Sequence, residues 1–213
     1  MSYKYLFRII ILGHPGVGKS SLLARLCDDV CRPIYQPTIG IDFGSTMTYL
    51  FQESKDIPIK SHLWDTAGQE YFSPIVRNYY RGIAGAILLF DISHKESFER
   101  LIYWLDELKN YNQHPALNLV LIGNKIDLEK RRVISQYQAK QFAEEHNMDY
   151  YEVSIKDNIG IADCYHQYIK KIYETIDETI GTLPPGIKPH AFAETPSTDI
   201  TIPLKNLKCC PIL

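Results

Sequence analysis

The chain has 213 residues, of which 45% are hydrophobic and 23% charged, and these proportions are typical of a globular protein with a generous core. Its formal net charge of −2 gives no reason to expect nucleic-acid binding. Because no apolar run approaches the roughly 18 residues of a membrane span and the N-terminus lacks the layout of a signal peptide, we expect a cytoplasmic protein.

Apolar runs alternate with amphipathic helical patterns through most of the chain. Residues 41–53 alternate in polarity and predict an edge strand that pairs antiparallel with 57–65. The other runs are apolar at consecutive positions, as strands buried on both faces are, and the rhythm predicts a doubly wound α/β sheet. The predicted strands besides 41–53 are 5–12, 59–64, 85–92, 117–124 and 148–155, and the predicted helices are 20–29, 97–112, 135–147 and 161–176.

The first motif follows the strand 5–12. Gly13, Gly18, Lys19 and Ser20 fit the pattern G-x-x-x-x-G-K-[ST]. Glycines let backbone N–H groups turn inward around an anion, and the helix that follows points its positive end at the same place. Although such a loop can match by chance, a strand before it and a helix after it favour phosphate binding. Lys19 would then reach the outer phosphates and Ser20 would ligate Mg²⁺.

The second motif is WDTAGQE at 64–70. Asp65 closes a buried strand and is well placed to hold Mg²⁺ through water. Gly68 would bring a backbone N–H to a terminal phosphate, and Gln69 could orient a water for attack on it. Taken alone, DTAG is equally compatible with an ordinary turn between a strand and a helix.

The third motif is GNKID at 123–127, directly after an apolar run. Asp127 offers two acceptors side by side, which match the N1–H and exocyclic amine of guanine, whereas adenine has no such pair of donors. The alternative is a turn with solvated charges. The position of the GNKID motif at the end of a strand favours base recognition over this alternative.

Composition changes after Ile180. Residues 181–208 hold five of the twelve prolines and show no helical period, so we predict a domain at 1–180 and a flexible tail at 181–213. The chain ends in C-a-a-X with Leu at the last position, the geranylgeranyl pattern, and Cys209 precedes Cys210. The alternative is an accidental cysteine pair. Stable attachment would require two lipids, because one chain binds reversibly and the nearby cations are few.

Together the three motifs resemble the Ras superfamily of small GTPases over residues 5–180. The segments 39–43, 64–72, 79–82 and 85–91 and the terminal CCPIL resemble the Rab family. The resemblance implies a P-loop NTPase fold with three α/β/α layers, a six-stranded, mostly parallel sheet with one antiparallel edge strand, and about five helices.

The resemblance also implies a role for individual positions. Lys19 and Gln69 would serve catalysis, Ser20 and Thr38 would ligate Mg²⁺ directly, and Asp65 would do so through water. Thr38 lies in the first switch, and Gly68 begins the second. The implied nucleotide-binding set is Gly13, Pro15, Gly16, Val17, Gly18, Lys19, Ser20, Ser21, Tyr35, Thr38, Gly68, Asn124, Lys125, Asp127, Leu128, Ser154, Ile155 and Lys156. The implied effector-binding set is Ile41, Phe43, Trp64 and Tyr79, although core packing of these aromatic residues is an alternative.

Three positions depart from the pattern of that family. Pro15 restricts the segment nearest the γ-phosphate, and we expect Gln69-dependent hydrolysis to survive it. Cys31 stands where an aromatic residue usually packs against guanine, which predicts faster nucleotide release. Ile155 replaces an alanine, so it keeps its backbone N–H but adds bulk that would press the loop outward.

The sequence therefore predicts a Rab-like switch that binds GTP or GDP with Mg²⁺ and hydrolyses GTP slowly. The implied partners are an exchange factor, a GTPase-activating protein, a dissociation inhibitor, effectors and, through prenyl groups, the cytoplasmic face of an intracellular membrane. We expect a monomer that regulates vesicle transport. The alternatives are a GTP-locked scaffold with little hydrolysis and an ATP-dependent phosphotransferase built on the same loop.

Overall fold

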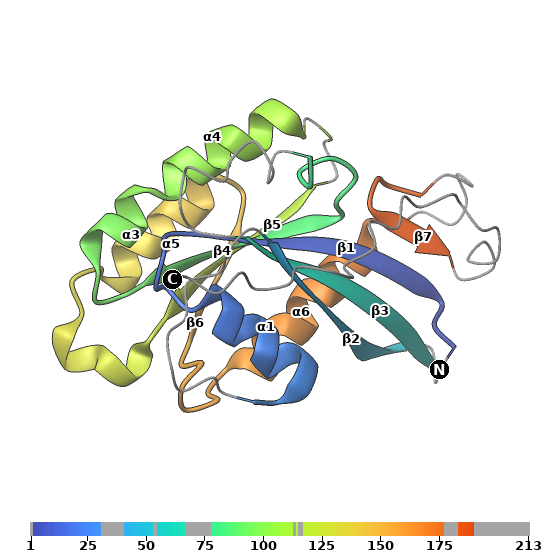
Figure 1. The fold of residues 1–213 in the computed structure, drawn as a ribbon, viewed down its shortest axis with the longest axis horizontal. Coiled ribbons are helices and arrows are strands. Elements are labelled where there is room, and N and C mark those ends of the chain that lie inside the picture. Colours follow the sequence, from blue (N-terminus) through green and yellow to red (C-terminus); the bar gives the residue numbers. More distant parts are fainter. Residues whose placement is uncertain are drawn as a thin grey trace, which may run out of the picture.

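The computed structural model describes residues 2–30, 41–52, 55–66, 78–112, 114, 117–176 and 183–189. Its centre is a seven-stranded sheet in which six strands follow the order β2-β3-β1-β4-β5-β6 and β7 pairs with β1 (Figure 1). The strands are β1 (Tyr5–Leu12), β2 (Ile41–Gln52), β3 (Lys55–Thr66), β4 (Gly85–Asp91), β5 (Asn118–Asn124), β6 (Asp149–Val153) and β7 (Ile187–Pro189).

The pairing of the strands confirms the predicted sheet. β1 pairs parallel with β3 and β4, and β5 pairs parallel with β4 and β6. β2 pairs antiparallel with β3 at the edge, with Phe43 opposite Trp64. Every residue of β4 is buried, as its uninterrupted apolar sequence requires of a central parallel strand.

Helices cover both faces of this sheet, which completes the predicted three layers (Figure 1). Residues of α1 and α6 belong to one buried hydrophobic cluster, and residues of α4 and α5 belong to the other. The part of the chain that the structure describes has five α-helices, as predicted, and one 3₁₀ helix, η2 (Ile126–Arg131). The α-helices are α1 (Lys19–Asp28), α3 (Lys95–Glu99), α4 (Leu101–Tyr111), α5 (Gln136–Glu145) and α6 (Ile161–Glu174).

One predicted helix, 97–112, differs from the observed structure. It begins earlier and divides at Arg100 into α3 and α4. The buried hydroxyl of Ser97 donates to the carbonyl oxygen of His94, 2.7 Å away, and accepts from the backbone N–H of Asp91 at 3.0 Å. These bonds fasten the short helix α3 to the end of β4.

The strand β7 is the main correction to the sequence analysis, which predicted six strands and a tail without structure from residue 181. Ile187–Pro189 pairs antiparallel with Tyr5–Phe7 of β1. The preceding prolines and Gly186 form a turn, in which Gly186 has φ 81°, and its carbonyl oxygen accepts from the N–H of Arg8 at 2.9 Å. Ile187 is buried in the hydrophobic cluster below the sheet. The division of the chain at residue 180 stays a prediction.

Candidate nucleotide-binding site

The phosphate loop lies between the end of β1 and the start of α1. Gly13, Gly16 and Gly18 have φ values of 146°, 78° and 108°, a range that favours glycine over every other residue. A Cβ atom on Gly18 would come within 2.7 Å of Nδ2 of Asn124, so the third glycine also permits close packing against β5. The loop therefore has the backbone that an anion cradle at a helix N-terminus requires.

Lys19 is the first residue of α1, and its side chain reaches back into this loop. Its Nζ donates to the carbonyl oxygens of Gly13 at 2.8 Å and His14 at 3.1 Å. Burial lowers the pKa of Lys19 from 10.5 to about 8, and the carboxylate of Asp65 opposes that shift. Phosphate oxygens placed in the loop would favour the charged form and raise this pKa again.

Ser20 and Asp65 meet beside the loop although they come from different elements. The hydroxyl of Ser20, in the first turn of α1, donates to Oδ2 of Asp65, which is wholly buried at the end of β3. Hydroxyl and carboxylate oxygens are ligands that suit Mg²⁺, so this pair fits the ion that the sequence predicted. Within the described residues no group of three His, Cys, Asp or Glu side chains could hold a metal ion by itself.

Asn124 joins the phosphate loop to the segment after β6. Its Nδ2 donates to the carbonyl oxygen of Val17 at 2.8 Å, and its Oδ1 accepts from the N–H of Ile155 at 3.1 Å. Ile155 is buried in the hydrophobic cluster, and a Cβ atom on Gly18 would come within 3.3 Å of its Cδ1, so the side chain packs beside the phosphate loop. That its bulk presses the loop outward stays a prediction.

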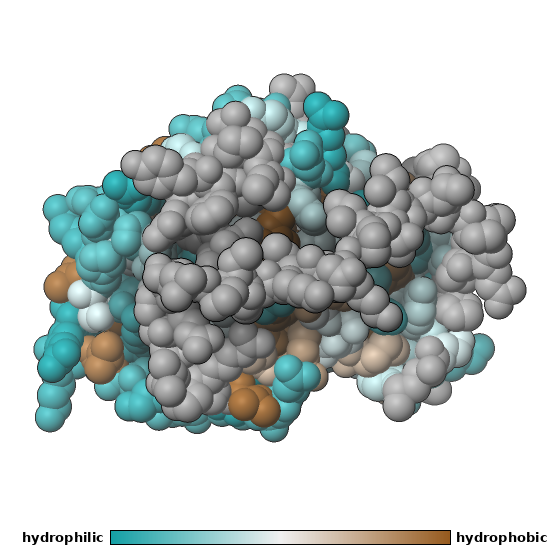
Figure 2. Space-filling view, in the orientation of Figure 1, coloured by the Kyte–Doolittle hydropathy of each residue, from teal (hydrophilic) through white to brown (hydrophobic). Residues whose placement is uncertain are grey.

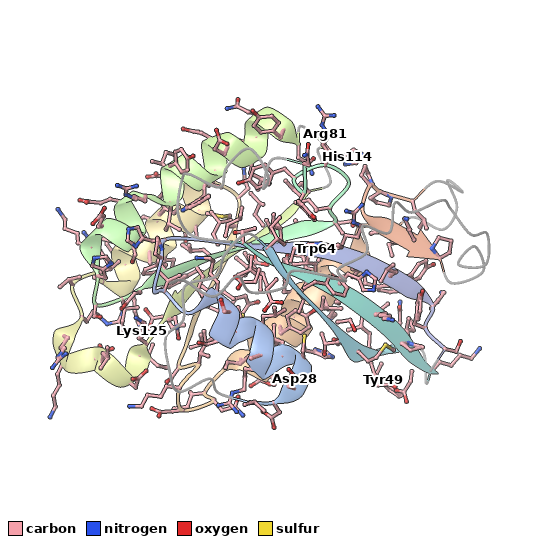
Figure 3. All side chains as sticks on the ribbon, viewed as in Figure 1. Asp28, Tyr49, Trp64, Arg81, His114 and Lys125 are labelled. Carbon is pink, nitrogen blue, oxygen red and sulfur yellow. The ribbon has the colours of Figure 1, made fainter. Side chains whose placement is uncertain are left out.

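Lys125 follows Asn124 in a left-handed backbone conformation, with φ 71°. Its Nζ donates to the carbonyl oxygen of Gly16 at 2.9 Å and forms an ion pair with Asp91 at 2.6 Å. Figure 3 shows Lys125 at the same side of the molecule as the start of α1. The side chain therefore holds the phosphate loop against the ends of β4 and β5.

Asp127 lies opposite the segment after β6. Its Oδ1 accepts from the hydroxyl of Ser154 at 2.8 Å, and Nζ of Lys156 is 3.9 Å from its Oδ2. Leu128 is the next residue of η2. The structure thus brings Asp127 next to Ser154 and Lys156, although α5 and β6 lie between them in the sequence.

Asp91 is a residue of this site that the sequence analysis missed. Both the backbone N–H and the hydroxyl of Ser93 donate to its Oδ1, at 2.8 and 2.7 Å. Burial alone would raise the pKa of Asp91, but the hydrogen bonds from Lys125 and Ser93 hold that pKa below its ordinary value. The sequence did contain a signal that could have identified Asp91, because this residue lies at the end of a buried strand, as Asp65 does.

The aromatic residues of the predicted effector-binding set form a cluster on the sheet. The ring centroids of Phe43 and Trp64 are 5.4 Å apart, and those of Trp64 and Tyr79 are 6.3 Å apart. Phe43 is 52% exposed, and Ile41 is half-buried beside the cluster. Trp64 is well separated from Lys125 (Figure 3). The cluster is therefore distinct from the predicted base-binding loops.

Several predicted residues lie outside the described part of the chain. They are Cys31, Tyr35, Thr38, Gly68, Gln69, Cys209 and Cys210. Their predicted roles remain predictions.

Comparison with known proteins adds one finding. A sequence model of the Ras family matches residues 8–174, which include all of the strands and helices described above from α1 to α6. No helix among the described residues is both long and apolar enough to cross a membrane. The helices α3 and α4 present mainly hydrophilic residues on the face that Figure 2 shows.

Proposed function

Since the chain belongs to the Ras family of small GTPases, we propose that it is a Rab-like switch that regulates vesicle trafficking. In the GTP form it recruits effectors, and hydrolysis to GDP ends that state. The observation that supports the nucleotide most strongly is the joining of the phosphate loop, Asn124 and Asp127 by hydrogen bonds into one site. The Rab assignment rests on the sequence segments and on the exposed Phe43 next to Trp64.

The proposed reaction is in-line attack of water on the γ-phosphorus of GTP, with GDP and phosphate as products. Gln69 orients the water. Lys19 and the inward backbone N–H groups of the phosphate loop stabilise the charge that develops on the phosphate oxygens. Ser20, Thr38 and, through water, Asp65 would hold Mg²⁺, which when bound neutralises phosphate charge.

We expect slow hydrolysis because the phosphate loop has no arginine that could stabilise the transition state. The phosphate loop, residues 13–20, contains no arginine, and Arg32, the nearest candidate in the first switch, is expected to be solvated and not to act as an internal finger. We therefore propose that a GTPase-activating protein supplies the missing cation. An exchange factor, a dissociation inhibitor and effectors complete the proposed set of partners, and the body is a monomer.

Hydrolysis should depend on Gln69 in spite of Pro15. Replacement of Gln69 by Leu removes the group that orients water, so the single-turnover rate of GTP hydrolysis should fall by about 10- to 100-fold. Phosphate release over hours, in the presence of Mg²⁺, measures this rate. A wild-type protein that releases no phosphate, with or without an activating protein, would be the GTP-locked scaffold instead. Equal rates in the two proteins would exclude the proposed role of Gln69.

We propose that prenyl groups on Cys209 and Cys210 attach the switch to the cytoplasmic face of an intracellular membrane. Two lipids hold a protein stably, whereas one does so only reversibly. A tagged protein in which both cysteines are replaced by Ser should therefore move from membranes to the soluble fraction. The single replacements should give an intermediate, exchanging distribution. A double variant that stays on membranes would contradict the lipid anchor.

A further inference from the structure

Arg132 connects the two segments of the chain that carry the proposed base contacts. On one side, its Nε and Nη2 donate to Glu129 at 2.8 and 2.7 Å. On the other side, its Nη1 and Nη2 donate to the two carboxylate oxygens of Glu152 at 2.7 and 2.8 Å. One guanidinium therefore joins η2 to β6 through two carboxylates.

The two carboxylates lie close to the base-binding residues along the chain. Glu129 is in η2 two residues after Asp127, and Glu152 is in β6 two residues before Ser154. The direct hydrogen bond between Ser154 and Asp127 crosses the same gap. Arg132 thus connects the two segments within one turn of the groups that would contact guanine.

The surroundings of Glu152 indicate a fixed arrangement. Gln136 donates to its Oε2 at 2.9 Å, and the hydroxyl of Tyr150 donates to its Oε1. Burial alone would raise the pKa of Glu152, but the hydrogen bonds from Arg132, Tyr150 and Gln136 hold that pKa below its ordinary value. The carboxylate is therefore ionised at neutral pH and has several donors.

Burial distinguishes this ion pair from ordinary surface pairs. The side chains of Arg132 and Glu152 are only 14% and 13% exposed, whereas that of Glu129 is 63% exposed. Exposed ion pairs contribute little, but a shielded, bidentate pair has a defined geometry and cannot lose one partner without leaving the other charge poorly solvated. Its defined geometry suits it to hold two loops in register.

We propose that Arg132 is a positioning residue for guanine recognition, which holds Asp127 and the 154–156 segment at the separation that the base requires. Arg132 acts through Glu129 and Glu152 and does not contact the nucleotide. The inference rests on the proposed guanine site. It assigns a functional role to a residue that lies outside the predicted nucleotide-binding set.

The test compares two fluorescent nucleotides, mant-GDP and mant-IDP. Hypoxanthine keeps N1–H but lacks the exocyclic amine, so IDP uses only part of the Asp127 carboxylate. In Arg132→Ala the release of mant-GDP should become about tenfold faster and that of mant-IDP only about twofold faster, because positioning matters most for the ligand that uses both acceptors. Equal acceleration for both nucleotides would indicate general loosening and would overturn the proposal.

Lys171→Ala provides a matched control. Lys171 of α6 forms an ion pair with Asp149 at 2.7 Å, at the opposite end of β6 from Ser154. The change removes one cation that pairs with the same strand, β6, without touching the base-binding segments. It should change both release rates by less than about twofold. A Lys171 variant that alters the GDP-to-IDP ratio as much as Arg132→Ala does would refute the specific role of Arg132.

Two further variants keep the proposal testable if Arg132→Ala does not fold. Arg132→Lys keeps the charge but cannot bind both carboxylates bidentately, so its GDP release rate should lie between those of wild type and Arg132→Ala. Glu129→Gln removes only the exposed half of the connection and should fold even if Arg132→Ala does not, with faster GDP release. Unchanged release in both variants would overturn the proposal. If wild type itself does not distinguish GDP from IDP, the proposed guanine site fails, and the inference fails with it.

Discussion

Replacement of Asp127 by Asn should lower the affinity for GDP by about 10⁴-fold and make xanthosine diphosphate the better ligand. The carboxylate of Asp127 presents two acceptors, which suit the N1–H and exocyclic amine of guanine. The amide of Asn presents one acceptor and one donor. Xanthine has a carbonyl oxygen in place of that amine, so the donor of Asn gains a partner with xanthine and faces the amine with guanine.

Displacement of mant-GDP by GDP, xanthosine diphosphate and ADP measures this change in preference. Asp157→Asn is the matched control, since Asp157 is exposed and lies three residues beyond Ser154, and the substitution makes the same change in charge. The control should keep the wild-type preference. If ADP displaced mant-GDP from wild type as well as GDP does, the site would not read guanine, and the ATP-dependent phosphotransferase would become the better explanation.

Replacement of Lys19 by Met should lower the affinity for GDP by about 10²- to 10³-fold while the empty protein keeps its stability. The ammonium is buried, so the folded protein bears a desolvation cost that nearby phosphate charge offsets. Met has a similar length and no charge. It therefore removes both that cost and the two hydrogen bonds to Gly13 and His14, and these losses act in opposite directions on the empty protein.

Thermal unfolding with and without GDP separates the two effects. For the Met variant, GDP should no longer raise the unfolding temperature, whereas the unfolding temperature without nucleotide should change by only a few degrees. Lys140→Met, at an exposed position of α5, should behave like wild type in both measurements. A Met variant that is still protected by GDP would show that Lys19 does not contact the phosphates.

The sequence predicted the elements whose own residues carry the pattern of burial, such as strands that are apolar at consecutive positions. β1 and β4 could be placed to within a residue, because a strand covered on both faces must be apolar at consecutive positions. The predicted base-binding loops also come together, because the carboxyl ends of parallel strands meet at one edge of the sheet. Asn124 and Ile155 are hydrogen-bonded for this reason, although a whole helix separates them.

The features that the sequence analysis missed depend on pairing between distant residues. Residues 129–132 read EKRR, and nothing in that pattern shows that Arg132, and not Arg131, binds Glu152. No local sequence pattern predicts the ion pair of Asp91 with Lys125 either, because the two residues are far apart in the chain. β7 was missed because three residues after two prolines and a glycine carry no periodicity. They form a strand only because β4 pairs with β1 from Ile9 onward and leaves the backbone of Tyr5–Phe7 available.

The pairing of β7 with β1 has a consequence for how the chain folds during its synthesis. β1 is the first strand to leave the ribosome, and the segment that completes its pairing is made after every other strand of the sheet. Until then the backbone of Tyr5–Phe7 has an open edge on that side. An open edge can pair with other chains, so a nascent or truncated protein that ends before residue 183 should depend on chaperones more than the full chain does.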